Sequence, residues 1–301
     1  MKYYRFKTNT TSYFFPKVNI NQEFLYGLYS ALGGNISRLY WWLFRNNAII
    51  RWMNAIDENR LNFPYRRIKE LVGDNCLLSF NMGSPGAEQK ISILAYDNIT
   101  GLRFFAKFAE KPDAMALTKN EINILPELAD VGIAPALLDY KIANDYVWLK
   151  TQHIQGQRLT DIRLNAGIVR ICTDLSSLNF NKNLQNNARL LSSFSHGDFC
   201  PWNILVNNQQ LRLIDWEMAE ERPLGYDLFT YIFQTAFLLS KRPVREIIRQ
   251  NSQWIEMYFA AFNISDYAPY LKSFATEKIQ AEIQKGSGKL LKKYQLLFNS
   301  L

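Results

Sequence analysis

The pattern of hydrophobic and polar positions divides the chain into three parts. In the first part, apolar side chains recur at helical spacing from Asn35 to Ile56. Pro64 stands where a shorter helix, extending through Val72, would begin. Residues 1–75 are therefore predicted to form a helical N-terminal extension.

The second part, residues 76–155, has the alternation and the turn residues that are typical of strands. The pattern predicts three strands, one helix and two further strands, which together make a five-stranded lobe. The strand-like runs are 76–80, 90–96, 103–108, 136–142 and 146–154, and the helical stretch is 114–130.

The third part, residues 156–301, is mainly helical. One strand-like island interrupts it at residues 196–215, and residues 224–239 are apolar on nearly every side, as in a buried helix. Further helices are predicted at 244–264, 267–285 and 289–298. The order of elements predicts an α+β protein of two lobes, a small β-rich one and a larger helical one.

Composition narrows the class of protein. Of the 301 residues 48% are apolar, which indicates a packed protein rather than a disordered one. Three cysteines without a CxxC pair and only two histidines argue against a disulfide framework, a zinc site and a His-rich metal site. The sequence does not open with a signal-peptide run, and no stretch reaches the roughly 18 apolar residues that span a bilayer. We therefore expect a cytoplasmic protein.

The positive charge is concentrated at one end of the chain. The first 70 residues hold 11 Lys and Arg against 4 Asp and Glu, and so carry +7 of the net charge of +8. Because the remainder is nearly neutral, we expect no nucleic-acid partner. The same 70 residues hold 16 of the 43 aromatic residues. Two interpretations stay open: an extension packed on the β-rich lobe through an aromatic core, or a segment that contacts another chain or a membrane.

The strongest chemical signal is Ser-His-Gly-Asp-Phe-Cys-Pro-Trp-Asn-Ile-Leu-Val at 195–206, followed by Leu-Arg-Leu-Ile-Asp-Trp-Glu at 211–217. Phosphoryl transfer needs a carboxylate that accepts or orients the attacking hydroxyl, and oxygen ligands for magnesium. Asp198 and Asn203 have the spacing of the Asp and Asn in kinase catalytic loops. The strand-like runs that follow Asn203 and precede Asp215 predict a hairpin, which would bring these two residues to one end.

This stretch resembles the aminoglycoside phosphotransferase and choline kinase superfamily, whose motif is H-G-D-x-x-x-x-N followed by a strand that ends in I-D-W/F-E/D. The resemblance implies a protein kinase-like fold, with ATP and magnesium as cofactors. It implies that residues 76–155 form the nucleotide-binding lobe and that residues 156–301 form the catalytic and acceptor-binding lobe. It implies that Asp198 is the catalytic base, and that Asn203 and Asp215 complete the catalytic set as metal ligands. For His196 it implies a structural role in the loop. Gly197 stands where protein kinases have Arg, which implies no dependence on a phosphorylated activation loop.

The resemblance extends to both sides of this stretch. Asp227 lies where the family's next helix starts, which implies an Asp that braces the catalytic loop. Upstream, Lys107 on the third strand suits the lysine that pairs with the ATP phosphates, and Glu121 on the following helix suits its ion-pair partner. Lys111 and Glu127 are the alternatives for these two positions.

The nucleotide site is also expected to include a loop and a hinge. The sequence Asn-Met-Gly-Ser-Pro-Gly at 81–86 would lie over the phosphates, where backbone N–H groups without large side chains permit close approach. Residues 152–156 lie where the hinge between the lobes belongs, and their backbone is expected to hold the adenine. The nucleotide-binding residues predicted in these two segments are Gly83, Ser84, Gly86, His153 and Ile154.

The motif indicates the type of reaction and does not identify the molecule that accepts the phosphoryl group. Residues 241–301 hold ten Lys and Arg against five Asp and Glu. This balance favours a neutral or anionic small molecule, such as a sugar or a surface-glycan precursor, over a polycationic antibiotic. A protein kinase is disfavoured by Gly197 and by the lack of an Ala-Pro-Glu segment after Asp215. One alternative is a pseudokinase or nucleotide-binding regulatory protein, which the unusual loop at 81–86 would suit. The other is an aminoglycoside- or choline-type kinase.

Overall fold

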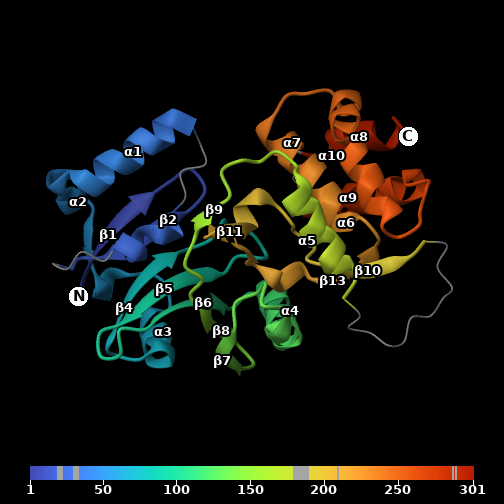
Figure 1. Ribbon diagram of the computed structural model, residues 1–301. Coiled ribbons are helices and arrows are strands. Elements are labelled where there is room, and N and C mark those ends of the chain that lie inside the picture. The colour runs from blue at the N-terminus through green and yellow to red at the C-terminus, as the bar shows by residue number, and fades with distance from the viewer. Residues whose placement is uncertain (19–22, 30–33, 179–189, 209, 287, 289) are drawn as a thin grey trace. The chain divides into compact units, whose positions relative to one another are not determined.

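The computed structural model describes residues 1–301 except 19–22, 30–33, 179–189, 209, 287 and 289. The chain forms two compact units (Figure 1). We call the first, Met1–Pro126 with Pro135–His153, the sheet unit. The second, Glu127–Ala134 with Ile154–Leu301, is the helical unit.

An antiparallel sheet dominates the sheet unit (Figure 1). In the described residues it has eight strands, in the order β3-β1-β2-β4-β5-β6-β8-β7. The strands are β1 (Lys2–Lys7), β2 (Ser12–Pro16), β3 (Ala55–Asp57), β4 (Cys76–Asn81), β5 (Ile91–Asp97), β6 (Arg103–Ala109), β7 (Leu137–Ile142) and β8 (Val147–Gln152). The helices that begin in this unit are η1 (Glu23–Leu28), α1 (Gly34–Asn46), α2 (Ala48–Met53), η2 (Glu58–Arg60), α3 (Tyr65–Val72) and α4 (Pro112–Glu127).

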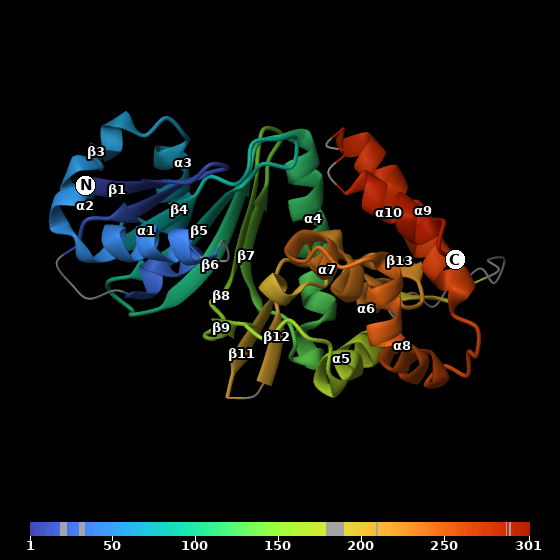
Figure 2. The same ribbon diagram turned by 90° about the horizontal axis from the view of Figure 1, so that it is seen from above.

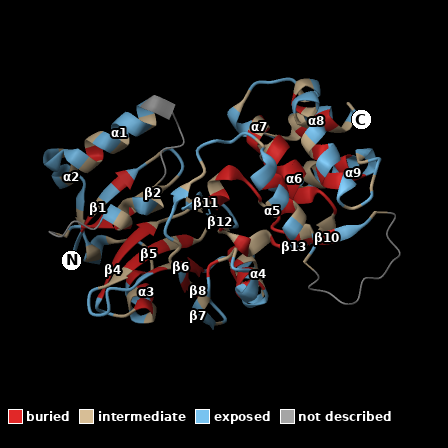
Figure 3. Cartoon of the chain, in the orientation of Figure 1, coloured by how far each residue is buried: buried red, intermediate tan, exposed pale blue. Residues whose placement is uncertain are grey.

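The centre of the sheet is buried on both faces, as the red strands of Figure 3 show. Alternate residues of a strand point to opposite faces, so one strand can serve two cores. Leu78 and Phe80 of β4 pack in one core with Ile68 of α3. Leu77, directly before Leu78, packs on the other side of the sheet with Leu25 of η1. The five strands β4 to β8 lie where the sequence predicts them.

The prediction of a purely helical extension over residues 1–75 is wrong, because β1, β2 and β3 belong to it and continue the sheet. The strands pair in register, with Tyr4 opposite Phe15 and Phe14 opposite Phe80. Phe14 and Phe15 are adjacent and face different cores. A strand that is apolar on both faces lacks the polar alternation that identifies a half-buried strand, which explains why the sequence did not reveal it.

The helix predicted from Asn35 to Ile56 is two helices, α1 and α2, separated at Asn47. The side-chain oxygen of Asn47 accepts hydrogen bonds from the backbone N–H groups of Ile49 at 2.9 Å and Ile50 at 3.2 Å. This N-cap starts a new helix and competes with continuation of the first one.

The helices α1 and α2 enclose an aromatic core against the outer strands, as the first interpretation of this segment requires. Phe44 of α1 is buried with Phe6 of β1 and Phe15 of β2. Trp41 stacks on Phe44 with ring centroids 5.7 Å apart and 13° between the planes. The aromatic residues of the extension are therefore, in part, a structural core.

The helical unit contains the predicted helices and two small sheets. The larger helices are α5 (Ala166–Ser176), α8 (Val244–Ala260), α9 (Ala268–Lys285) and α10 (Leu291–Phe298), and α9 and α10 pack side by side (Figure 2). One sheet pairs β10 (Ser192–Ser195) with β13 (Glu220–Pro223), and the other has the order β12-β11-β9. Its strands are β9 (Gln157–Arg158), β11 (Ile204–Asn207) and β12 (Gln210–Leu213). Short helices are η3 (Ala129–Val131), η4 (Pro201–Asn203) and η5 (Trp216–Met218).

The buried helix predicted at 224–239 is present and contains a π-helical turn. It consists of α6 (Tyr226–Phe229), the π-helix η6 (Thr230–Gln234) and α7 (Thr235–Leu239). Phe229 and Phe233 pack on Phe274 of α9, with ring centroids 5.6 and 6.2 Å apart. A π turn inside a helix is rare and is found mostly at functional sites.

The predicted fold class, α+β with a β-rich part and a larger helical part, is confirmed. The two units have the composition expected of the small and large lobes of a protein kinase-like fold. Among the described residues, no helix is both long enough and apolar enough to cross a membrane.

Candidate active site

The predicted catalytic loop, residues 195–203, leads from β10 to β11 in the helical unit. Gly197 has φ +82°, and a Cβ at this position would lie 2.1 Å from the carbonyl oxygen of Met218. A larger residue would collide with backbone and would also have to adopt the left-handed conformation. The loop therefore requires glycine between His196 and Asp198.

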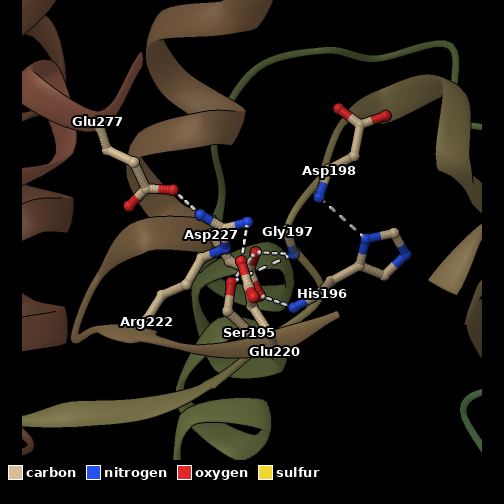
Figure 4. A network of polar contacts seen from close by, with 8 residues as sticks. All are labelled: Ser195, His196, Gly197, Asp198, Glu220, Arg222, Asp227 and Glu277. Atoms are coloured by element: carbon tan, nitrogen blue, oxygen red, sulfur yellow. Dashed lines mark hydrogen bonds and ion pairs between the residues drawn. The ribbon is translucent and has the colours of Figure 1, made fainter. Parts of the chain in front are cut away.

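Asp227, in the first turn of α6, holds this loop through its carboxylate (Figure 4). Its carboxylate accepts hydrogen bonds from Ser195 Oγ at 2.7 Å, from the N–H of His196 at 2.7 Å and from the N–H of Gly197 at 3.0 Å. Asp227 is only 4% exposed, and three donors offset the cost of burying a carboxylate. This is the bracing contact that the sequence resemblance implied.

His196 is a structural residue of the loop. Its Nε2 donates to the carbonyl oxygen of Ile214 at 3.0 Å, and its Nδ1 accepts from the N–H of Asp198 at 3.3 Å. Its side chain is fully buried and its ring lies 4.5 Å from that of Trp216, measured between centroids. With both ring nitrogens bonded to backbone, His196 has no nitrogen left to take a proton from a substrate.

The carboxylate of Asp198 is oriented by two amides, one on each oxygen. Asn203 Nδ2 donates to Oδ2 at 2.8 Å, and Gln234 Nε2 donates to Oδ1 at 2.8 Å. The thiol of Cys200 lies 3.6 Å from Oδ1. Burial, together with the nearby Asp198 carboxylate, raises the pKa of the Cys200 thiol well above its ordinary value, so the thiol stays protonated. Asp198 is thus fixed in position and keeps oxygen lone pairs for a further donor.

Gln234 and Lys278 belong to this site and were not predicted from the sequence. Lys278 Nζ of α9 donates to Gln234 Oε1 at 3.2 Å. The same ammonium lies over the rings of Tyr226 and Phe274, 4.8 and 5.5 Å from their centroids. One signal for Gln234 was available in the sequence, because it is an amide two turns after Asp227 in an otherwise largely apolar helix.

The predicted hairpin is confirmed, and it brings Asn203 and Asp215 to one end. Strands β11 and β12 pair with Ile204 opposite Leu213, and the N–H of Ile214 donates to the carbonyl oxygen of Asn203 at 3.0 Å. Asp215 has φ +66°, a left-handed conformation that is uncommon outside glycine. Such conformations cost of order 1–3 kcal/mol and cluster at functional sites.

Asn203 and Asp215 offer donors that suit magnesium. Because Asn203 Nδ2 donates to Asp198, its amide oxygen is the atom left for a cation, and Asp215 places a carboxylate residue at the same end of the hairpin. Magnesium prefers oxygen ligands and usually takes one or two from the protein, with water and phosphate oxygens for the rest. No cluster of three or more His, Cys, Asp or Glu suited to a metal occurs among the described residues. The donor set therefore fits Mg²⁺ bound together with a nucleotide.

In the sheet unit the structure pairs Lys107 with Glu121. Lys107 Nζ of β6 lies 2.5 Å from Glu121 Oε2 of α4, and the residues are 1% and 2% exposed. The alternatives are placed elsewhere: Lys111 donates to the carbonyl oxygen of Gly86 at 2.7 Å, and Glu127 is exposed. The structure thus favours the first choice over both alternatives, and the role of the pair toward ATP stays a prediction.

The loop predicted to lie over the phosphates connects β4 and β5. Gly83 has φ +66°, and a Cβ there would lie 2.6 Å from the carbonyl oxygen of Lys90. Its N–H donates to Asn81 Oδ1 at 3.1 Å, which differs from the expectation of an N–H directed to a ligand. Ser84 and Gly86 are exposed. The loop is shaped by glycine, and its part in nucleotide binding stays a prediction.

The boundary between the two units falls between His153 and Ile154, in the segment where the sequence predicts the hinge. Within the sheet unit, His153 packs edge-to-face on Phe24 with centroids 5.9 Å apart. Burial lowers the pKa of His153, and the positive charge of Arg103 lowers it further. Binding of adenine by this segment stays a prediction.

The sequence was also compared with known proteins. The model of the phosphotransferase enzyme family matches residues 172–270, about a third of the chain. This segment contains Asp198, Asn203, Asp215 and Asp227, which are the residues that carried the predicted resemblance. None of the curated proteins matches the sequence.

Several solved structures are similar over much of the chain. An aminoglycoside-3'-phosphotransferase of type VIII is 15% identical, with 77% of this chain and 96% of that chain covered and a TM-score of 0.49. The choline kinase of Cryptosporidium parvum Iowa II is 13% identical, with 77% and 89% covered and a TM-score of 0.47. The phosphotransferase APH(3'')-Id of Streptomyces rimosus, in complex with ADP and streptomycin, is 15% identical, with 66% and 90% covered and a TM-score of 0.44. With TM-scores below 0.5, these likenesses say nothing of the substrate of this chain.

The class that the family match and the site define is a phosphotransferase. The match supports the predicted resemblance over residues 172–270, the segment that holds the site, and agrees with an enzyme of the phosphotransferase type.

Proposed function

We propose that this protein is an ATP- and magnesium-dependent kinase that phosphorylates a hydroxyl group of a sugar or a surface-glycan precursor. The observation that carries the proposal is the position of Asp198, held by amides on both oxygens beside the hairpin end that presents Asn203 and Asp215. A cytoplasmic location, where ATP is available, is part of the proposal. The three free cysteines agree with a reducing compartment.

Asp198 is the proposed general base. In the reaction, the acceptor hydroxyl gives its proton to Asp198, its oxygen forms a bond to the γ-phosphorus, and the bond from that phosphorus to the β-phosphate oxygen breaks to release ADP. Asn203 and Gln234 hold the carboxylate in one orientation and so reduce the entropy cost of reaching a reactive geometry. Phosphoryl transfer depends mainly on such positioning and on electrostatic stabilisation.

Further residues are proposed to bind the nucleotide. Asn203 and Asp215 are the proposed ligands of Mg²⁺, which when bound neutralises charge on the phosphates. Lys107 is the proposed partner of the α- and β-phosphates, with Glu121 fixing its ammonium. Gly83, Ser84, Gly86, His153 and Ile154 are the further residues proposed to contact ATP.

Charge next to the base supports a neutral or anionic acceptor. Lys278 reaches Gln234, the residue that holds Asp198, and among the described residues it forms no ion pair. The neighbouring Glu277 does not neutralise it, because Glu277 pairs with Arg222 (Figure 4). A fixed ammonium close to the base repels a polycationic aminoglycoside or a choline and attracts a carboxylate or phosphate on the acceptor.

The second candidate is a pseudokinase that binds nucleotide without transfer. The bonded N–H of Gly83 in the loop over the phosphates favours it. The ordered geometry around Asp198 argues against it, because a protein without catalysis has no need of a carboxylate oriented on both oxygens.

The test is magnesium-dependent ATP consumption with a panel of neutral sugars, uronic acids, sugar phosphates, choline and aminoglycosides. We expect turnover with a member of the first three groups and none with Asp198→Ala, which should still bind ATP. Turnover by Asp198→Ala would overturn the mechanism. A wild-type protein that binds ATP but consumes none of it with any acceptor of the panel would support the pseudokinase.

A further inference from the structure

The outward side of α1 and α2 is apolar and exposed. Six large apolar residues on these helices have between 58% and 86% of their surface exposed. They are Ile36, Leu39 and Trp42 of α1 and Ile49, Trp52 and Met53 of α2, and we call them the α1–α2 surface. Spacings of three and four residues place the members of each set on one side of their helix. Single exposed apolar residues are ordinary, whereas six within 18 residues mark a contact surface.

The aromatic core does not account for this surface. Phe44 and Trp41 pack inward on Phe6, on the opposite side of α1 from Leu39. The extension therefore has two apolar sides, one that attaches it to the sheet and one that faces outward. In Figure 3 most of α2 is coloured as exposed.

The charge of the segment indicates what covers the α1–α2 surface. Residues 24–56 contain three arginines and no Asp or Glu. Arg38 is exposed beside Leu39 and Trp42, and among the described residues it has no carboxylate within ion-pair distance. Arg45 pairs with Glu23 at 2.8 Å. The surface is thus apolar with a cationic margin and no acidic residue of its own.

A second copy of the chain does not suit such a surface. In a symmetric dimer the same patch meets itself, so each Arg38 would face a surface without a carboxylate. A bilayer with anionic lipids supplies a hydrocarbon boundary for the apolar side chains and negative headgroups for Arg38. Tryptophan is favoured at the boundary between lipid headgroups and hydrocarbon, and Trp42 and Trp52 are both available for it.

We propose that α1 and α2 lie on the surface of an anionic membrane, with Trp42, Trp52 and the neighbouring aliphatic side chains in the headgroup boundary. The helices lie on the membrane without crossing it. This inference is independent of the proposed function, because it uses none of the residues of the active site.

The experiment measures co-sedimentation of the full-length protein with phosphatidylcholine vesicles that either contain or lack phosphatidylglycerol. We expect binding to the anionic vesicles, weaker binding at high salt, and little binding to phosphatidylcholine alone. The double variant Trp42→Ser/Trp52→Ser should lower the partition coefficient by about tenfold or more. Arg38→Glu should weaken binding to the anionic vesicles alone.

A matched control is Ile99→Ser/Leu102→Ser, in the turn between β5 and β6, whose apolar side chains are 74% and 65% exposed but lie outside the surface. It should bind vesicles as the wild type does. The proposal is overturned if the wild type does not bind anionic vesicles, or if both double variants bind equally well. It is also overturned if light scattering shows a dimer that the tryptophan variant alone dissociates.

Discussion

The side-chain amide of Gln234 donates a 2.8 Å hydrogen bond to Oδ1 of Asp198. The two residues are far apart in the sequence, and the π-helical turn η6 ends at Gln234. Asn203, on the other carboxylate oxygen, is part of the family motif, whereas Gln234 is not. The proposed base is therefore oriented by one residue of the loop, Asn203, and by one residue of the helix, Gln234.

Replacing Gln234 by Ala should lower kcat and leave ATP binding unchanged. A hydrogen bond to a charged group contributes about 1.5–3 kcal/mol, which corresponds to roughly 10- to 100-fold in rate if it acts on the transition state. Steady-state kinetics should show the loss in kcat at an unaltered KM for ATP. Gln250→Ala, on the exposed side of α8, is the control and should have wild-type kinetics. Equal kcat values for the two variants would show that Gln234 does not contribute to the reaction.

Gly197→Ala should destabilise the protein strongly. The new Cβ would lie 2.1 Å from the carbonyl oxygen of Met218, at a φ of +82°. Backbone must move to relieve this contact, and we expect a loss of about 3 kcal/mol in the free energy of unfolding, measured in urea. Gly286→Ala is matched in conformation, with φ +63°, but has no neighbour within 4 Å. It should cost only about 1 kcal/mol, the price of the left-handed conformation. Similar losses in the two variants would contradict the steric explanation.

Lys107→Met should destabilise the sheet unit, because it leaves Glu121 buried without its partner. Removing one partner of a buried ion pair costs about 3–5 kcal/mol of stability, whereas replacing both partners by apolar residues is often neutral. The double variant Lys107→Met/Glu121→Leu should therefore regain most of the stability. Urea unfolding measures this recovery.

Titration with ATP distinguishes a role of Lys107 in stability from a role in nucleotide binding. Neither the single nor the double variant should bind ATP as the wild type does, since both lack the lysine ammonium. Recovery of ATP affinity along with stability would show that Lys107 has a structural role only.

Stability should decrease at alkaline pH. Burial raises the pKa of the Cys172 thiol well above its ordinary value of 9.0. The unfolded chain then releases this proton at a lower pH than the folded protein does. The stabilisation is complete below pH 9.0 and is lost above it, by up to about 1.4 kcal/mol per pH unit for one thiol.

Urea unfolding at pH 8 and pH 10 tests this prediction. Cys172→Ala should show a smaller decrease between the two pH values than the wild type. Some decrease should persist in that variant, because burial also raises the pKa of Tyr258 and Tyr294. If Cys172→Ala lost as much stability between the two pH values as the wild type, Cys172 would not contribute to the pH dependence.

The sequence predicts those parts of the site in which residues near one another in the chain are also near in space. Asp198 and Asn203 are five residues apart, and the hairpin that joins Asn203 to Asp215 follows from its own alternating pattern. In both cases the local geometry fixes the contact. Asp227 was assigned through the family resemblance, since its contacts with the loop span 30 to 32 residues.

Two features could not be read in this way, for different physical reasons. The strand β2 is apolar on both faces, so the alternation typical of a strand is hidden, and its pairing with β4 is a contact between distant parts of the chain. Lys278 reaches the site from α9 through packing on Tyr226, a tertiary contact that leaves no periodic signal. The core strands of the sheet unit, by contrast, were predicted because turn residues separate them.

The π-helical turn makes the site sensitive to the number of residues in one helix as well as to their identity. Asp227 anchors the start of this helix to the catalytic loop, and Gln234 must arrive at the other end with its amide toward Asp198. Each residue in an α-helix turns the next by about 100°, so removing one between them would close the wide turn and point Gln234 elsewhere. Alanine scanning preserves the count of residues and would miss this constraint. Across related sequences, the segment between these two anchors should change in composition more readily than in length.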